Sequence, residues 1–223
     1  MKKMFFVMAV LAAVLIGFAG CNQPNTAKSG NGGGTTPPPV KSNTVYDVST
    51  ELSCMVTAMG GIEFGKGQSN KGDKYKPLLE SAYVTIDANG KAKLIAKFRK
   101  STVNVLGIDA NTFIDPRNST PGYYDTDGTK KDAEFTLSAA GDTAIPPVAD
   151  PDRKKGVRYV TSMTFPVSKE KSEYLLWIYI NSSVMGVQFC DGANTDGAGS
   201  GEPNKSTKYV GKITIDWDTI RER

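Results

Sequence analysis

Apolar residues alternate with polar ones in short segments along most of this chain, and this alternation constrains its fold more than any other feature. A period of two places every second side chain on one face of a β-strand, whereas a helix needs a period near 3.6. No long stretch shows the helical period. The segments expected to be strands are Thr44 to Val56, Ala82 to Asp87, Lys91 to Phe98, Thr102 to Ile108, Glu134 to Ser138, Arg158 to Pro166, Glu173 to Asn181 and Tyr209 to Trp217.

Turn signals separate these segments. The clearest is Asp87-Ala88-Asn89-Gly90-Lys91, in which Asn-Gly supplies the positive φ angles of a tight hairpin. Between the first two strands, the apolar stretches 58–65 and 76–81 indicate a short helix or packed loop. The sequence therefore predicts an all-β fold, an immunoglobulin-like β-sandwich of about eight strands with that helix or loop after the first strand.

The first twenty residues have the pattern of a cleaved leader. Lys2 and Lys3 precede an apolar run, and small residues stand directly before Cys21. This arrangement resembles the lipobox of bacterial lipoproteins, which implies cleavage before Cys21 and acylation of its thiol. The alternative is a retained membrane helix, but the apolar run is short for a bilayer about 30 Å thick. We therefore expect a lipid anchor at Cys21 in the cell membrane or the outer membrane.

Residues 21–43 read as a flexible tether, because they contain Gly-rich and Pro-rich stretches and almost no apolar side chains. Residues 44–223 are enough for one domain, which the tether holds outside the cytoplasm as part of the cell envelope. Without the leader, 25 of the 27 basic residues remain against 23 acidic ones. This near balance argues against nucleic acid as a partner.

Histidine is absent, which removes the commonest general base and the commonest transition-metal ligand. Serine-histidine and cysteine-histidine catalysis are thereby excluded, and we expect a binding protein with no catalytic residues rather than an enzyme. Two cysteines remain besides Cys21, and in an exported domain they favour a disulfide between Cys54 and Cys190.

The segment from Tyr174 to Ile180 is apolar on both faces. One face belongs to the core of the domain. The other carries Leu175, Trp177 and Tyr179, and it needs a cover, since large exposed apolar patches usually mark contact sites. The cover can be a partner or an apolar ligand, or it can be an ordinary loop over a central strand.

Two Met-Gly steps lie at equal distances from the predicted disulfide. Met59 follows Cys54 by five residues and Met185 precedes Cys190 by five, so a bridge would bring both methionines near one cleft. Filling of the core is the alternative role for either side chain.

The order of several motifs resembles the NEAT domains of bacterial surface haem-uptake proteins. The motifs are the two Met-Gly steps, Leu78 to Ala82 followed by Asn89-Gly90-Lys91, then Met163 to Pro166 and Ile213 to Trp217. The resemblance implies an immunoglobulin-like sandwich that holds haem between a short helix after the first strand and a hairpin of the last-but-two and last-but-one strands. It places Met59 on the helix side and Met185 at the hairpin.

The ligand motif departs from that family. Haem-binding NEAT domains carry Tyr-x-x-x-Tyr in the hairpin, whereas Tyr174 and Tyr179 here are five apart and lie earlier in the strand. Either Met185, opposite Met59, takes the place of the tyrosine as ligand of the haem iron, or haem binding has been lost.

Two functional hypotheses follow. The first is haem or porphyrin binding for iron acquisition or haem relay, with Met59, Met185, Trp177 and Tyr179 at the cofactor. Its partners would be a haem-carrying protein and a transporter. The second is an adhesin, or a module that binds a protein or a glycan, and that binds no haem.

Overall fold

The computed structural model describes residues 43–56, 62–68, 71–105, 107–184, 186–189 and 209–223. All of them belong to one compact unit, Thr36–Arg223. Within these ranges the regular secondary structure is β-strand, apart from a single 3-10 turn, η3 (Asp73–Tyr75), and there is no α-helix. None of the described segments is a helix that could cross a membrane.

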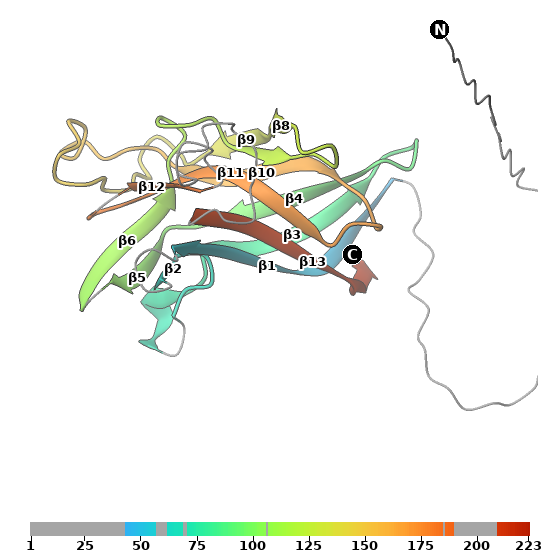
Figure 1. Ribbon diagram of the computed structural model, residues 1–223, viewed down its shortest axis with the longest axis horizontal. Helices are drawn as coiled ribbons and strands as arrows, with labels where there is room; N and C mark the ends of the chain where they lie inside the picture. Colours follow the sequence, from blue (N-terminus) through green and yellow to red (C-terminus); the bar gives the residue numbers. More distant parts are fainter. Residues whose placement is uncertain (1–42, 57–61, 69–70, 106, 185, 190–208) are drawn as a thin grey trace, which may run out of the picture. The chain divides into compact units, whose positions relative to one another are not determined.

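The described residues form one curled antiparallel sheet, in which the strand order is β5-β6-β11-β13-β1-β3-β4-β10-β9 (Figure 1). Strand β12 pairs with β11, β2 with β1, and β7 with both β11 and β8. The strands are β1 (Thr44–Val56), β2 (Ile62–Glu63), β3 (Leu79–Ile86), β4 (Ala92–Phe98), β5 (Ser101–Val105), β6 (Ile108–Ile114), β7 (Gly122–Tyr124), β8 (Lys130–Asp132), β9 (Glu134–Leu137), β10 (Val160–Val167), β11 (Glu173–Ser182), β12 (Gly186–Phe189) and β13 (Tyr209–Glu222).

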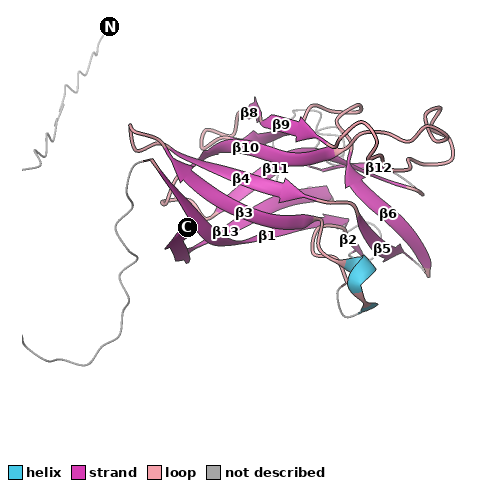
Figure 2. Ribbon diagram, turned by 180° about the vertical axis from the view of Figure 1, so that it is seen from behind, coloured by secondary structure: helices cyan, strands magenta, loops and turns pink. Residues whose placement is uncertain are grey.

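Pairing between the first and last strands defines the two ends of the sheet. Tyr46 lies opposite Glu222, and Val56 lies opposite Tyr209. We call the end near Asn43 the base; it also carries the β3–β4 turn and the loop after β10 (Figure 2). The opposite end, the tip, carries the turns that follow β5 and β11 and the long connection 138–159.

The core lies between the curled parts of the sheet and follows the alternation of the sequence. On β11, the side chains of Tyr174, Leu176, Ile178 and Ile180 are buried, whereas those between them, Leu175, Trp177 and Tyr179, are half-buried. Phe165 of β10 stacks on Tyr123 of β7, with ring centroids 5.1 Å apart. These contacts bring distant parts of the chain into one hydrophobic cluster.

The predicted hairpin at Asp87–Lys91 is confirmed. The Asp87 amide donates to the Lys91 carbonyl at 3.0 Å, and Gly90 has a φ of 76°. The Asp87 carboxylate accepts the amides of Asn89 and Lys91 at 2.8 and 2.9 Å. A side-chain acceptor and a glycine thus stabilise the same turn locally.

Two details differ from the sequence-based expectation. The described residues form thirteen strands rather than about eight. The predicted strand 102–108 is wrong at its end, because the chain reverses at Gly107 (φ 87°) and Ile108 begins β6. Of the two alternatives for the connection after β1, its described residues form the packed loop, which buries Phe64 and Leu78 and contains β2 and the turn η3.

Cys54 lies on β1 and is fully buried. Cys190 lies outside the residues that the structure describes, and no disulfide is seen within them. The bridge between these two cysteines therefore stays a prediction.

Truncating a core side chain of β11 should destabilise the whole sheet. Leu176 is 0% exposed, and Leu176→Ala should lower the free energy of unfolding by about 2–5 kcal/mol. Ile108→Ala is the control, because Ile108 is 59% exposed and its truncation should cost less than about 0.5 kcal/mol. Urea unfolding measures both, and equal losses would contradict the assigned core.

Candidate functional site

The connection between β9 and β10 crosses the tip and is held as a defined structure. The Ala144 amide donates to the Val157 carbonyl, and the Val157 amide donates to the Ala144 carbonyl, both at 2.8 Å. The chain between these residues carries two of the most exposed apolar side chains among the described residues, Ile145 at 49% and Val148 at 78%.

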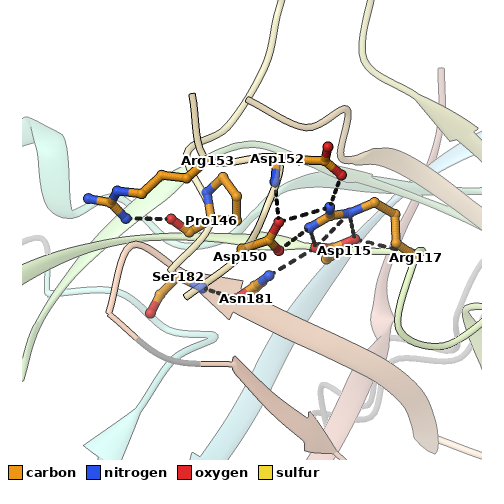
Figure 3. A network of polar contacts seen from close by, with 8 residues as sticks. All are labelled: Asp115, Arg117, Pro146, Asp150, Asp152, Arg153, Asn181 and Ser182. Carbon is orange, nitrogen blue, oxygen red and sulfur yellow. Dashed lines mark hydrogen bonds and ion pairs between the residues drawn. The ribbon is translucent and has the colours of Figure 1, made fainter. Parts of the chain in front are cut away.

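Arg117 joins this connection to the sheet (Figure 3). Its Nη2 donates to Asp115 Oδ2 and to Asp150 Oδ2, each at 2.7 Å. Its Nη1 donates to Asp152 Oδ2 at 2.9 Å. One guanidinium group, with donors arranged in a planar fork, thus binds three carboxylates from two separate segments.

Asp115 is the buried centre of this network, with a side chain that is 0% exposed. Besides Arg117, it accepts the side-chain amide of Asn181 at 2.9 Å. Its backbone amide donates to the Tyr179 carbonyl, also at 2.9 Å. A buried carboxylate is tolerated only when it is paired and hydrogen-bonded, and here strand β11 and Arg117 supply these partners.

The charges in the network shift one another's proton affinities. The carboxylates of Asp115 and Asp150 raise the pKa of Arg117 above its ordinary value, and Arg117 in turn lowers the pKa of Asp150. Both shifts favour the charged pair.

Two Asp-Pro turns shape the network. Asp115 Oδ1 accepts the Arg117 amide at 3.0 Å, and Asp150 Oδ1 accepts the Asp152 amide at 2.9 Å. In both, an aspartate before a proline accepts the amide two residues on, which is the geometry of an Asx-turn.

Arg153 connects the loop to the turn after β11. Its Nη1 donates to the Pro146 carbonyl at 2.6 Å and to the Ser183 carbonyl at 3.3 Å. The neighbour of Ser183 is Val184, which is 47% exposed. We call Ile145, Val148 and Val184 together the tip patch, since shared contacts to Arg153 hold their segments side by side.

A second cluster fixes the two ends of the connection. Asp142 accepts from the Tyr159 hydroxyl and from Lys100 Nζ, each at 2.6 Å. Burial, and next the hydrogen bond to Asp142, raise the pKa of Tyr159 to about 12. The tyrosine therefore stays a neutral donor across the ordinary pH range.

The structure places Trp177 on the outer face of β11, under a cover made by the chain itself. The indole N–H donates to the Ser119 hydroxyl. Lys130 Nζ lies 4.4 Å from the ring centroid, and the Tyr124 ring lies 6.1 Å away. An ordinary loop and the β7–β8 hairpin thus contact this half-buried side chain, as one of the sequence-based alternatives proposed.

Tyr179 lies two residues further along the same face. Its hydroxyl packs so closely on Gly186 of β12 that a Cβ would not fit there. Burial, and next the negative charge of Asp115, raise its pKa. It is therefore a neutral group packed between β12 and the Arg117 network.

Two of the predicted haem contacts, Trp177 and Tyr179, are each contacted by protein groups in the described part of the chain. The other two predicted haem contacts, Met59 and Met185, lie outside the described residues, as does Cys21. In the described part of the chain, no group of three or more acidic, cysteine or histidine side chains is arranged to hold a metal ion.

Comparisons with protein-family models, with curated proteins and with solved structures find no match for this chain.

Breaking the Arg117 network should destabilise the protein. Arg117→Met leaves the buried Asp115 without its counter-charge, and we expect the free energy of unfolding to fall by about 2–3 kcal/mol at pH 7. This loss is smaller than for a fully buried pair, because 33% of the Arg117 side chain is exposed. Arg221→Met, at an exposed position near the base, is the control.

The loss should also depend on pH. Because Arg117 lowers the pKa of Asp150, their pairing stabilises the fold fully above the ordinary aspartate pKa near 3.9 and is lost as the pH falls through the lowered value. The difference between wild type and Arg117→Met should therefore be largest above about pH 5 and shrink below about pH 3. Urea unfolding across this range measures it, and a constant difference would contradict the charge pairing.

Proposed function

We propose that this protein is a lipid-anchored binding protein of the cell envelope, with no enzymatic activity, whose tip patch contacts a partner protein. Its curled sheet would be an immunoglobulin-like sandwich, carried on the tether 21–43 and anchored through Cys21. The observation that carries the proposal is the tip patch itself, three exposed apolar side chains on segments fixed by ion pairs and hydrogen bonds.

Rigidity matters because binding with a mobile loop loses conformational entropy. Ordering a loop or a side chain on association costs about 0.5–1.5 kcal/mol for each side chain immobilised. Here Arg117 and Arg153 already fix the segments that carry Ile145 and Val184. A partner would therefore gain the burial of apolar surface without first ordering this loop.

The position of the patch suits an anchored protein. The described chain starts at the base, beside Ile86, whereas the tip patch lies at the other end of the strands. A tether that attaches at the base leaves the tip at the end of the domain opposite the attachment point. The patch is then accessible to another protein.

Charged groups on the same loop as Ile145 and Val148 indicate the chemistry of the partner. Lys154 and Lys155 are exposed and follow Arg153 on the same loop. An apolar centre with a charged rim is the usual anatomy of a protein interface. We therefore expect the partner to present an apolar surface with acidic residues at its border.

Photo-cross-linking in cells of the source organism tests this proposal. A benzophenone amino acid at Val148 should give a discrete cross-linked product, whereas the same group at Asn89, on an exposed turn of the base, should not. A charge placed in the patch by Ile145→Asp should reduce the Val148 product at least five-fold. Equal products from both positions, or no effect of Ile145→Asp, would contradict the assignment of the tip.

Haem or porphyrin binding is the second candidate, and the strand ends at the tip favour it. Strand β1 ends at Val56, just before the segment that contains Met59. Strand β11 ends at Ser182 and β12 begins at Gly186, on either side of Met185 in the sequence. Both strand ends lie at the tip, with β13 between β1 and β11. The two methionines would ligate the haem iron, as thioethers do in some haem proteins.

A titration with haemin distinguishes this candidate. If the methionines hold the iron, the chain should give a sharp stoichiometric Soret band that Met59→Ala combined with Met185→Ala removes. The broad spectrum of free haemin alone would exclude haem binding and leave the protein-binding module.

A further inference from the structure

A pocket of about 800 Å³, which is widely open to solvent and which we call the base cavity, lies at the base between the β3–β4 turn and the end of β10. Its apolar lining includes Ile86, Pro166 and Val167, and its polar lining includes Lys91, Ser168 and Lys169. It is remote from the tip patch, which lies at the opposite end of the strands.

Both lysines of this cavity have their ammonium groups available. Among the described residues, no carboxylate lines the cavity, and neither Lys91 nor Lys169 forms an ion pair there. Nearby lysines are engaged, since Lys93 pairs with Glu134 at 3.3 Å and Lys171 lies 4.8 Å from the ring centroid of Tyr174. Two lysines and several apolar residues in one lining match an anionic headgroup joined to an apolar chain.

The start of the described chain lies beside the same cavity. Thr44 pairs with Ile86, so the tether enters the domain next to the cavity wall. If Cys21 is lipidated and residues 22–43 form the flexible tether that the sequence predicts, these 22 residues would have a root-mean-square length of about 26 Å. Lipid headgroups then meet the cavity at an effective concentration in the millimolar range or above, so that weak binding is enough.

We propose that the base cavity binds the headgroup of an anionic phospholipid in the membrane that anchors the chain. The phosphate would lie between Lys91 and Lys169, and the glycerol and first acyl carbons would lie against Ile86 and Val167. Docking of the base would orient the tip patch outward. This inference rests on the lipid anchoring proposed above.

A titration of the unlipidated chain tests this site directly. The chain from residue 21 onward, which contains every described residue, carries Cys21→Ser and is labelled with ¹⁵N. The probe is dihexanoyl phosphatidylglycerol below its micelle concentration, and dihexanoyl phosphatidylcholine and inorganic phosphate are the comparisons. We expect saturable shifts of the Gly90, Lys91 and Lys169 amides with phosphatidylglycerol alone.

Matched double variants identify the lysines. Lys91→Ala with Lys169→Ala should weaken binding about 30-fold, or about five-fold for each lysine near an anionic headgroup. Lys154→Ala with Lys155→Ala, at the tip, should leave it unchanged. Amides elsewhere in each spectrum should keep their positions, which reports an intact fold.

Several results would overturn the inference: no shifts at these amides, equal shifts with phosphatidylcholine, equal shifts with phosphate, or no effect of the base lysines. Lipid anchoring is tested separately, by asking whether Cys21→Ser moves the protein in cells from the membrane fraction to the soluble fraction. Because the titration uses an unlipidated chain, failure of the anchor and failure of the cavity site are distinguishable.

Discussion

The carboxylate of Asp115 is buried without exposure to water, and the arrangement of the tip depends on how its charge is balanced. A charge in that position is stable only with close counter-charges and donors. Arg117 and Asn181 provide them, and Arg117 extends the contact to Asp150 on the long connection. The pairing that balances one buried charge thereby adds a link between the long connection and the sheet, beside those made by Asp142 and Arg153.

The pairing of β1 with β13 determines which end of the sheet is the base and which is the tip that carries this network. The pairing joins the first and last described strands and places the start of the chain at the base. The tip patch and the base cavity consequently lie at opposite ends. The proposed membrane contact at one end and the proposed partner contact at the other would therefore be compatible in a single domain, and substitutions at one end should leave the other contact intact.

Local signals in the sequence predicted the parts of the fold that depend on neighbouring residues. The bounds of β1 and the Asp87–Lys91 turn are confirmed, because alternation and Asn-Gly act over a few residues. Strands β7 and β8 have three residues each, too few to show alternation. The pairing of Arg117 with Asp150 could not be predicted from the sequence. An Asp-Pro step stands before both Arg117 and Asp152, but Arg117 and Asp150 are 33 residues apart, and local patterns do not indicate contacts at that separation. The predicted methionine site lies outside the described residues and stays a prediction.

Amide hydrogen exchange tests most directly whether Arg117 fixes the loop that carries the tip patch. The amides of Ala144 and Val157 form the bridge that closes this loop. They should exchange slowly in the wild-type protein and at least ten-fold faster in Arg117→Met, under conditions where the amides of β1 and β13 keep their protection. Unchanged exchange at Ala144 and Val157 would contradict the claim that the Arg117 network holds the tip.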